Sequence, residues 1–148
     1  MDTSPEFDRC EHVFGLITDP KPRQFPLSHY AQPERTVVAV WHFTGIIENS
    51  GLGGFLSRDV IGDPDFSLVI DCFDRIGTTV ALDAVRTAVS HIQLPDGSVP
   101  DYRKRRELWD AVPEAERDRL DIQFFRAFDA IVAALASYIH HHGLDHTS

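Results

Sequence analysis

Aspartates gather in the middle of this sequence at spacings that suit the recognition of a charged partner. Between residues 59 and 83, six aspartates and a single arginine, Arg75, give a local formal charge of −5. The six are Asp59, Asp63, Asp65, Asp71, Asp74 and Asp83. On adjacent helices these carboxylates would present a negative face at the spacing of phosphates, and we expect that face to contact a basic protein. The alternative is that Asp63 or Asp65 caps a helix and the others only lie on solvated faces.

Histidines and other reactive side chains do not combine into a metal site or a catalytic site. The C-terminal histidines are His140, His141, His142 and His146. Gly143 interrupts the one i, i+4 pair among them, and no Cys, Asp or Glu supplies a matching spacing. His42 and Glu48 stand six residues apart on one helix, so their side chains point to different faces. We therefore expect no metal, no cofactor and no enzymatic activity.

One dense basic run, from Arg103 to Arg106, stands in a chain that is otherwise acidic. It has no aromatic residues interleaved with it, and Glu107 and Asp110 follow close behind. Ion pairs along a helix surface account for such a pattern, so we expect a solvated helix face. The chain as a whole carries a formal charge of −9, which disfavours direct binding to nucleic acid or to an anionic membrane.

A glycine-rich corner ends one helix and begins another between residues 48 and 55. Its glycines are Gly51, Gly53 and Gly54, and we expect at least one of them at positive φ, where a side chain is strained. No Gly-Lys-Ser/Thr follows and no buried strand precedes, so this is not a phosphate-binding loop. A small ligand-binding or enzymatic module at this corner is one alternative function. Its candidate residues are Glu48, Asn49, Gly53, Gly54 and Phe55.

The elements that position these residues are all predicted to be helices. A chain of 148 residues with 43% hydrophobic content suits one domain, and no strand-like alternation of any length occurs. We expect a proline-rich N-terminal arm over residues 1–32, with a short helix at about 6–16 and with Phe25, Leu27 and Tyr30 holding the arm against the body. Residues 33–148 should form a single compact orthogonal bundle of about six to seven helices.

Helical periodicity and capping residues mark the boundaries in that bundle. The expected helices cover about residues 33–47, 54–61, 64–76, 79–92 and 101–112, then a short helix from 113 and a last, longest helix from about 120. Thr78 should cap the helix that buries Val80, Ala81, Ala84, Val85, Ala88 and Ile92. The last helix should bury Ile122, Phe125, Phe128, Ile131 or Val132, Leu135, and Tyr138 or Ile139.

The two cysteines do not form a disulfide framework. Cys72 falls on an apolar helix face and should be buried, whereas Cys10 lies in a polar stretch and should be a surface thiol. No apolar run is long enough to span a bilayer, and the acidic N-terminus is not that of a signal or transit peptide. These features favour a cytoplasmic protein, either a monomer or a homodimer.

Three short motifs, in this order, give the chain a family resemblance from about Val37 to His142. They are Trp41 with Glu48-Asn49 and Gly53-Gly54-Phe55, then Cys72-Phe73-Asp74-Arg75-Ile76-Gly77-Thr78, then Leu120-Asp121-Ile122-Gln123-Phe124-Phe125 leading to Tyr138-Ile139-His140. The segment resembles the family built around the C-terminal domain of DNA-mimic proteins. It departs from that family where residues 50–52 interrupt the compact Asn-Gly-Gly-Phe sequence and where Leu56-Ser57-Arg58 follows Phe55. The resemblance implies an all-helical fold and an acidic surface that occupies a DNA-binding protein as a duplex would.

Charge and resemblance together predict a non-enzymatic, acidic domain that binds a basic protein. A DNA mimic is the sharpest form of this hypothesis. An immunity or antitoxin-like partner of a basic toxin is a second form, and the small module at the glycine-rich corner is the alternative from a different class.

Overall fold

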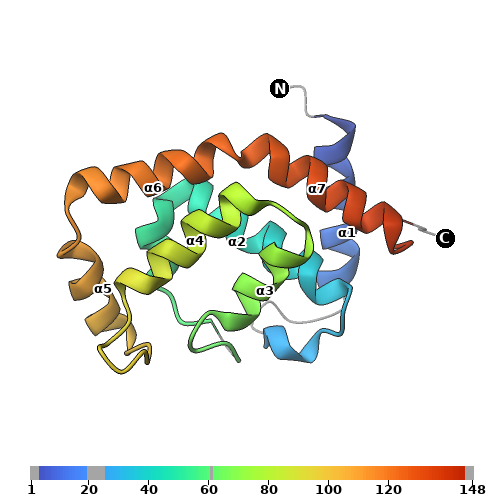
Figure 1. Cartoon of the computed structure of the whole chain (residues 1–148). Coiled ribbons are helices and arrows are strands. Elements are labelled where there is room, and N and C mark those ends of the chain that lie inside the picture. The colour runs from blue at the N-terminus through green and yellow to red at the C-terminus, as the bar shows by residue number, and fades with distance from the viewer. Residues whose placement is uncertain (1–3, 20–25, 61, 146–148) are drawn as a thin grey trace.

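The computed structural model describes residues 4–19, 26–60 and 62–145, and within these ranges every regular element is helical. The all-α prediction is therefore confirmed, as a compact helical bundle (Figure 1). The helices are α1 (Pro5–Thr18), α2 (Glu34–Leu56), α3 (Ser67–Arg75), α4 (Thr79–His91), α5 (Tyr102–Asp110), α6 (Glu114–Arg126) and α7 (Phe128–His141), with a 3-10 turn at Leu27–His29.

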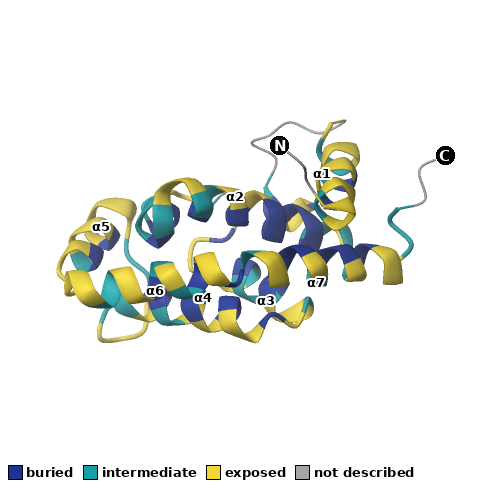
Figure 2. Cartoon of the chain, turned by 90° about the horizontal axis from the view of Figure 1, so that it is seen from above, coloured by how far each residue is buried: buried dark blue, intermediate teal, exposed yellow. Residues whose placement is uncertain are grey.

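Helix α2 forms the centre of the bundle, and every other helix contacts it. The apolar stripe expected on it is confirmed, because Val37, Val40, Trp41, Thr44 and Ile47 are all buried. Figure 2 shows the buried residues of α2 and α7 facing the interior of the bundle, with exposed residues on the outer faces. The core is thus built around one helix whose inward face the sequence marks clearly.

The N-terminal helix α1 packs across α2 and α7. Ser4 caps it by accepting a hydrogen bond from the Phe7 N–H. The expectation of a surface thiol at Cys10 is wrong, since this side chain is fully buried and its Sγ lies 3.7 Å from the Val132 carbonyl oxygen. The polar residues around Cys10 lie on the outer face of α1, which is why the local composition looked exposed.

The arm that follows α1 is held against the body as expected at two of its three positions. Leu27 and Tyr30 are buried, and Phe25 lies outside the described residues. Arg35 of α2 donates to the carbonyl oxygens of Tyr30 and Ser28, at 2.9 and 3.2 Å. These bonds fasten the end of the arm to the start of the central helix.

The C-terminal part of the bundle consists of two helices, as expected, but they divide at Ala127 and not at about residue 120, and the last helix is not the longest, since α2 has 23 residues and α7 has 14. Helix α6 runs from Glu114, and α7 follows it after a bend of 46° at Ala127. The expected buried stripe is correct only beyond the bend, where Ile131 and Leu135 are fully buried. Before it, Ile122 and Phe125 are 47% and 38% exposed. The core residues of α6 are instead Leu120 and Phe124, because the bend changes which side of the helix faces inward.

Two boundaries differ from the sequence expectation in the middle of the chain. The short second helix expected at 54–61 forms with other bounds, because helical geometry is broken at Gly51 and the segment that follows, which is counted as part of α2, ends at Leu56. Thr78 precedes α4, but its hydroxyl makes no capping bond. Val80, expected in the core, is 53% exposed, whereas the other five residues of the predicted α4 face are buried.

Among the described residues, no helix is by itself long and apolar enough to cross a bilayer, and only the bent pair of α6 and α7 together meets that length and composition.

Candidate functional site

The structure separates the six candidate aspartates according to what each one contacts. Asp63 is buried and serves the fold, because its carboxylate accepts hydrogen bonds from the Leu68 and Val69 N–H groups at 2.9 Å each. Asp63 therefore binds the free N–H groups at the start of α3, although it lies three residues before Phe66, the N-cap position of that helix. Burial raises the pKa of Asp63, and the two backbone bonds oppose that rise.

Three of the other aspartates are engaged at the surface. Asp59 accepts from Arg105 at 2.9 Å, and Asp71 accepts from Arg75 at 2.8 Å. Gln123 of α6 donates to Asp83 at 3.3 Å. Asp83 thereby belongs to the junction between α4 and α6, whereas Asp59 belongs to the contact between α5 and the end of α2.

Asp65, Asp71 and Asp74 remain as the solvent-facing carboxylates at α3 and the turn before it. Asp65 and Asp74 are exposed, and the side chain of Asp71 is 46% exposed. Hydrogen bonds from Ser67 lower the pKa of Asp65, which keeps this carboxylate ionised. We call these three residues the α3 carboxylates.

The basic run is the expected solvated helix face at three of its four positions, whereas Arg105 points into the protein and is only 4% exposed. Its guanidinium donates to the carbonyl oxygens of Leu56, Pro100 and Arg58 at 2.8 to 2.9 Å, as well as to Asp59. Trp109 is also buried and lies one turn further along α5. This i, i+4 relation between Arg105 and Trp109 is the signal in the sequence that would have placed Arg105 inside.

The glycine-rich corner is a break in α2 that residues from other helices hold in place. Gly51 has φ 72° and ψ 177°, which confirms the expected positive φ. The Leu52 N–H that the break releases donates to Asp121 of α6 at 2.9 Å. Asp121 thus acts as a cap supplied from a distant helix, a role that sequence analysis missed.

Several of the corner residues are used in packing or face solvent. Phe55 is fully buried in the core and Asn49 is exposed. A Cβ on Gly53 would lie 2.6 Å from Trp109 Nε1, so this glycine lets the indole pack directly on the backbone. Gly54 likewise lies against the Ser50 side chain. These glycines serve close packing in the structure.

Glu48, another candidate of the corner, lines an open groove. The groove has a volume of about 490 Å³, and its other walls are Phe125, Arg126, Phe128 and Asp129, from either side of the α6 to α7 bend. Glu48 Oε1 is buried and has no hydrogen-bond partner among the described residues. Burial raises the pKa of Glu48 above its ordinary value.

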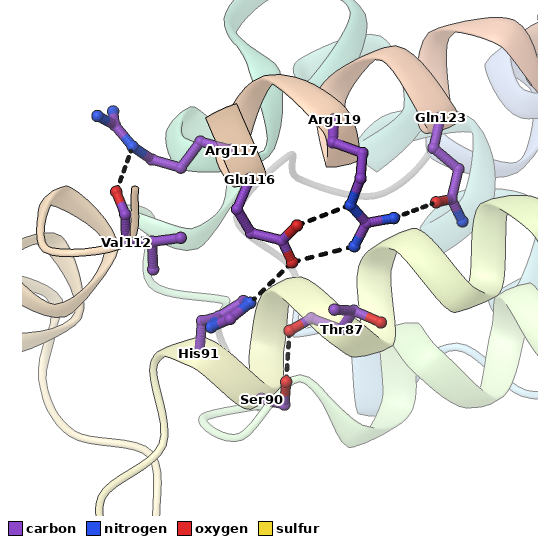
Figure 3. A network of polar contacts seen from close by, with 8 residues as sticks. All are labelled: Thr87, Ser90, His91, Val112, Glu116, Arg117, Arg119 and Gln123. Carbon is purple, nitrogen blue, oxygen red and sulfur yellow. Dashed lines mark hydrogen bonds and ion pairs between the residues drawn. The ribbon is translucent and has the colours of Figure 1, made fainter. Parts of the chain in front are cut away.

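A polar network joins α4 to the first half of α6 (Figure 3). Glu116 accepts from Arg119 at 2.7 and 3.0 Å, and its second oxygen lies 3.3 Å from His91 Nε2. Arg119 chiefly, and then His91, lower the pKa of Glu116 to about 2. Each partner of this carboxylate is a side chain of the same two helices, so the network fastens the end of α4 to α6.

A metal site is not assembled by the residues that the structure describes. No three His, Cys, Asp or Glu side chains among them lie close enough to share an ion. His140 lies 3.2 Å from Asp145, and His146 is outside the described residues.

Comparisons with known proteins identify the family. A family model described as DMP19-like protein matches residues 28–142, more than three quarters of the chain. Curated proteins and solved structures give no match. The matched segment contains α2 to α7 and with them the α3 carboxylates, the broken helix and the groove. The chain belongs to the DMP19-like family, the family of DNA mimic protein 19.

Proposed function

We propose that this chain is a non-enzymatic DNA mimic, which binds a DNA-binding protein at the surface that would otherwise contact duplex DNA. Membership of the DMP19-like family is the observation that carries this proposal. The formal charge of −9 supports it, because a partner that binds phosphates presents a basic surface. The proposed partner is thus a protein with a basic, DNA-binding surface.

The α3 carboxylates are the part of the acidic segment best suited to contact such a partner. One short stretch of chain exposes Asp65, Asp71 and Asp74 to solvent. The carboxylate of Asp63 instead binds backbone N–H groups at the start of α3. Asp71 is paired with Arg75, but the pair is exposed and an incoming guanidinium could replace Arg75 at little cost. The proposed contact is therefore centred on α3.

The direct test is displacement from DNA. A native lysate is loaded on immobilised duplex DNA, and the column is washed with the purified chain at constant ionic strength. We expect the chain to elute a specific DNA-binding protein, identified by mass spectrometry. Poly-glutamate at equal total charge serves as the control for non-specific competition. Elution no greater than with poly-glutamate would show that the chain does not mimic DNA.

The contact surface is tested with charge-matched variants. Replacement of Asp65, Asp71 and Asp74 by Asn should weaken displacement and reduce the salt dependence of the partner's association with the chain, because exposed charges act over about 8 to 10 Å at ordinary ionic strength. The control replaces three exposed acids of α5 and α6, namely Asp110→Asn, Glu114→Gln and Asp118→Asn. Equal effects of the two triple variants would mean that net charge, and not α3, governs binding.

A further inference from the structure

The groove at the α6 to α7 bend has the chemistry of a binding site. Its walls come from two parts of the chain that are far apart in sequence, since Glu48 belongs to α2 and the other four residues lie at positions 125, 126, 128 and 129. Three of the five carry a charge. Glu48 and Asp129 against Arg126 give the walls a formal charge of −1.

The carboxylate of Glu48 lacks the donor that a buried oxygen requires. Its Oε1 has no accessible surface, and no described residue donates a hydrogen bond to it. A buried acceptor left in this state destabilises the protein, and a ligand in the groove would remove the cost by donating an N–H group to this oxygen once the carboxylate turns toward the groove. The rise in the pKa of Glu48 has the same origin, namely burial without a compensating partner.

Aromatic surface lies beside this carboxylate. Phe125 is 38% exposed although it is large and apolar, and Phe128 is half-buried, with its ring 6.4 Å from that of Phe7. Phe128 thus packs against Phe7, whereas part of the Phe125 ring is accessible to a ligand. An aromatic ring next to a carboxylate suits a cation with an apolar stem, because the stem packs on the ring while the charge meets the acid.

We propose that this groove binds an arginine side chain presented by a basic protein partner, with the guanidinium donating to Glu48 and lying against Phe125. Arginine fits better than lysine because its planar, weakly hydrated group stacks on rings and donates several hydrogen bonds at once. Asp129 adds attraction from the exposed side of the groove, and Arg126 opposes it. The inference rests on the proposed function only for the source of the arginine, which would be the DNA-binding protein.

The groove is tested without knowledge of the partner, by titrating the full chain with N-acetyl-arginine amide and following backbone amide signals by NMR. We expect saturable shifts at residues 125–129 and at Glu48, with affinity in roughly the millimolar range of a single side chain. N-acetyl-citrulline amide, a neutral compound of the same shape, is the matched control. Equal shifts with both compounds, or no shifts at the groove with either, would overturn the proposal.

Variants of the walls give effects of opposite sign that a purely structural role would not produce. Glu48→Gln should weaken binding of the arginine probe about tenfold, which is the loss of one charge-assisted hydrogen bond. Phe125→Ala, at an exposed position, should also weaken it. Arg126→Gln should strengthen binding, because it removes the positive charge among the described residues of the walls. If Arg126→Gln weakens binding as much as Glu48→Gln does, the groove is not a cation site.

The two proposals fail separately. If the chain displaces no protein from DNA but the arginine probe still binds at the groove, the DNA-mimic function is wrong and the groove assignment is supported. If displacement succeeds but the probe does not bind, the groove assignment is overturned alone.

Discussion

Removal of the Arg105 side chain should strongly lower the free energy of unfolding, although this residue stands within a basic run of the kind that is typical of a protein surface. Its guanidinium is the donor for three backbone carbonyls, those of Leu56, Arg58 and Pro100, and for the carboxylate of Asp59. Arg105→Ala would leave all four acceptors without this donor. The Asp59 side chain is 73% exposed, so water can replace its partner, and the main cost falls on the carbonyls.

The magnitude follows from the burial of those acceptors. The bond to the Leu56 carbonyl is buried, and a buried acceptor without a partner costs about 1 to 3 kcal/mol. The carbonyls of Pro100 and Arg58 are partly accessible and cost less. The guanidinium also lies 5.5 Å from the ring centre of Phe66, a contact worth about 0.5 to 1 kcal/mol or more when desolvated. We expect a total loss of about 3 to 5 kcal/mol in the free energy of unfolding.

Urea denaturation followed by far-ultraviolet circular dichroism measures this loss, and the same basic run supplies the control. Arg106 is exposed, so Arg106→Ala should change stability by less than about 0.5 kcal/mol. Arg105→Lys should recover only part of the loss, because an ammonium group cannot span acceptors on several sides. A loss below about 1 kcal/mol for Arg105→Ala, or one equal to that of Arg106→Ala, would refute the structural role argued above.

Three substitutions and one labelling experiment test the fold further. Gly51→Ala should destabilise by about 1 to 3 kcal/mol, because φ 72° with ψ 177° strains any side chain, and a Cβ would lie 3.1 Å from Asp121 Oδ2. Gly45→Ala, inside α2 with open space around it, should instead stabilise by about 0.5 to 1 kcal/mol, and equal effects in thermal denaturation would contradict the assigned break. Leu135→Ala should cost about 2 to 5 kcal/mol in urea unfolding, since Leu135 is fully buried; a cost well under 1 kcal/mol would remove α7 from the core. Burial raises the pKa of Cys10 from 9.0 to about 12, so a disulfide reagent at pH 9 should modify this thiol only after unfolding. The stability that this shift contributes is complete below pH 9 and is lost as the pH rises toward 12, and rapid labelling of the native chain would refute the burial.

Hydrophobic periodicity predicted the helices well where one face of a straight helix meets the core. The stripe on α2 and the glycine break that ends it were both readable from residue types, because each depends on neighbours within one or two turns. The bend at Ala127 was not readable. Ile122 and Phe125 continue the spacing of the α7 stripe without interruption, and only the packing of α6 on α4 decides that Leu120 and Phe124 face inward.

The contacts that hold the corner were beyond sequence analysis for a different reason. Asp121 and Leu52 are 69 residues apart, and Arg105 and Leu56 are 49 apart. Nothing local distinguishes Asp121 from the other acids of α6, since its partner is a backbone N–H that becomes free only because α2 breaks. The prediction of the aspartate surface was incomplete for the same reason. Composition gives a local charge of −5, but it does not show that Asp63 is buried and unavailable to a partner.

The arrangement of charge also constrains how a DNA mimic of this kind would compete. Duplex DNA carries one negative charge per roughly 1.7 Å and releases condensed counterions when a protein binds it, so that interaction weakens steeply with salt. The α3 carboxylates are three charges on a short helix and its leading turn, one of them paired with Arg75, and such a surface condenses few ions. Binding of a partner to the chain should therefore weaken less with salt than binding of the same partner to DNA. We expect the concentration of chain that displaces half of the partner from immobilised DNA to fall as ionic strength is raised, below the salt at which DNA alone releases it. A displacement concentration that stays constant or rises with salt would mean that the partner's binding to the chain weakens with salt at least as steeply as its binding to DNA, and that the α3 carboxylates are too few to account for the contact.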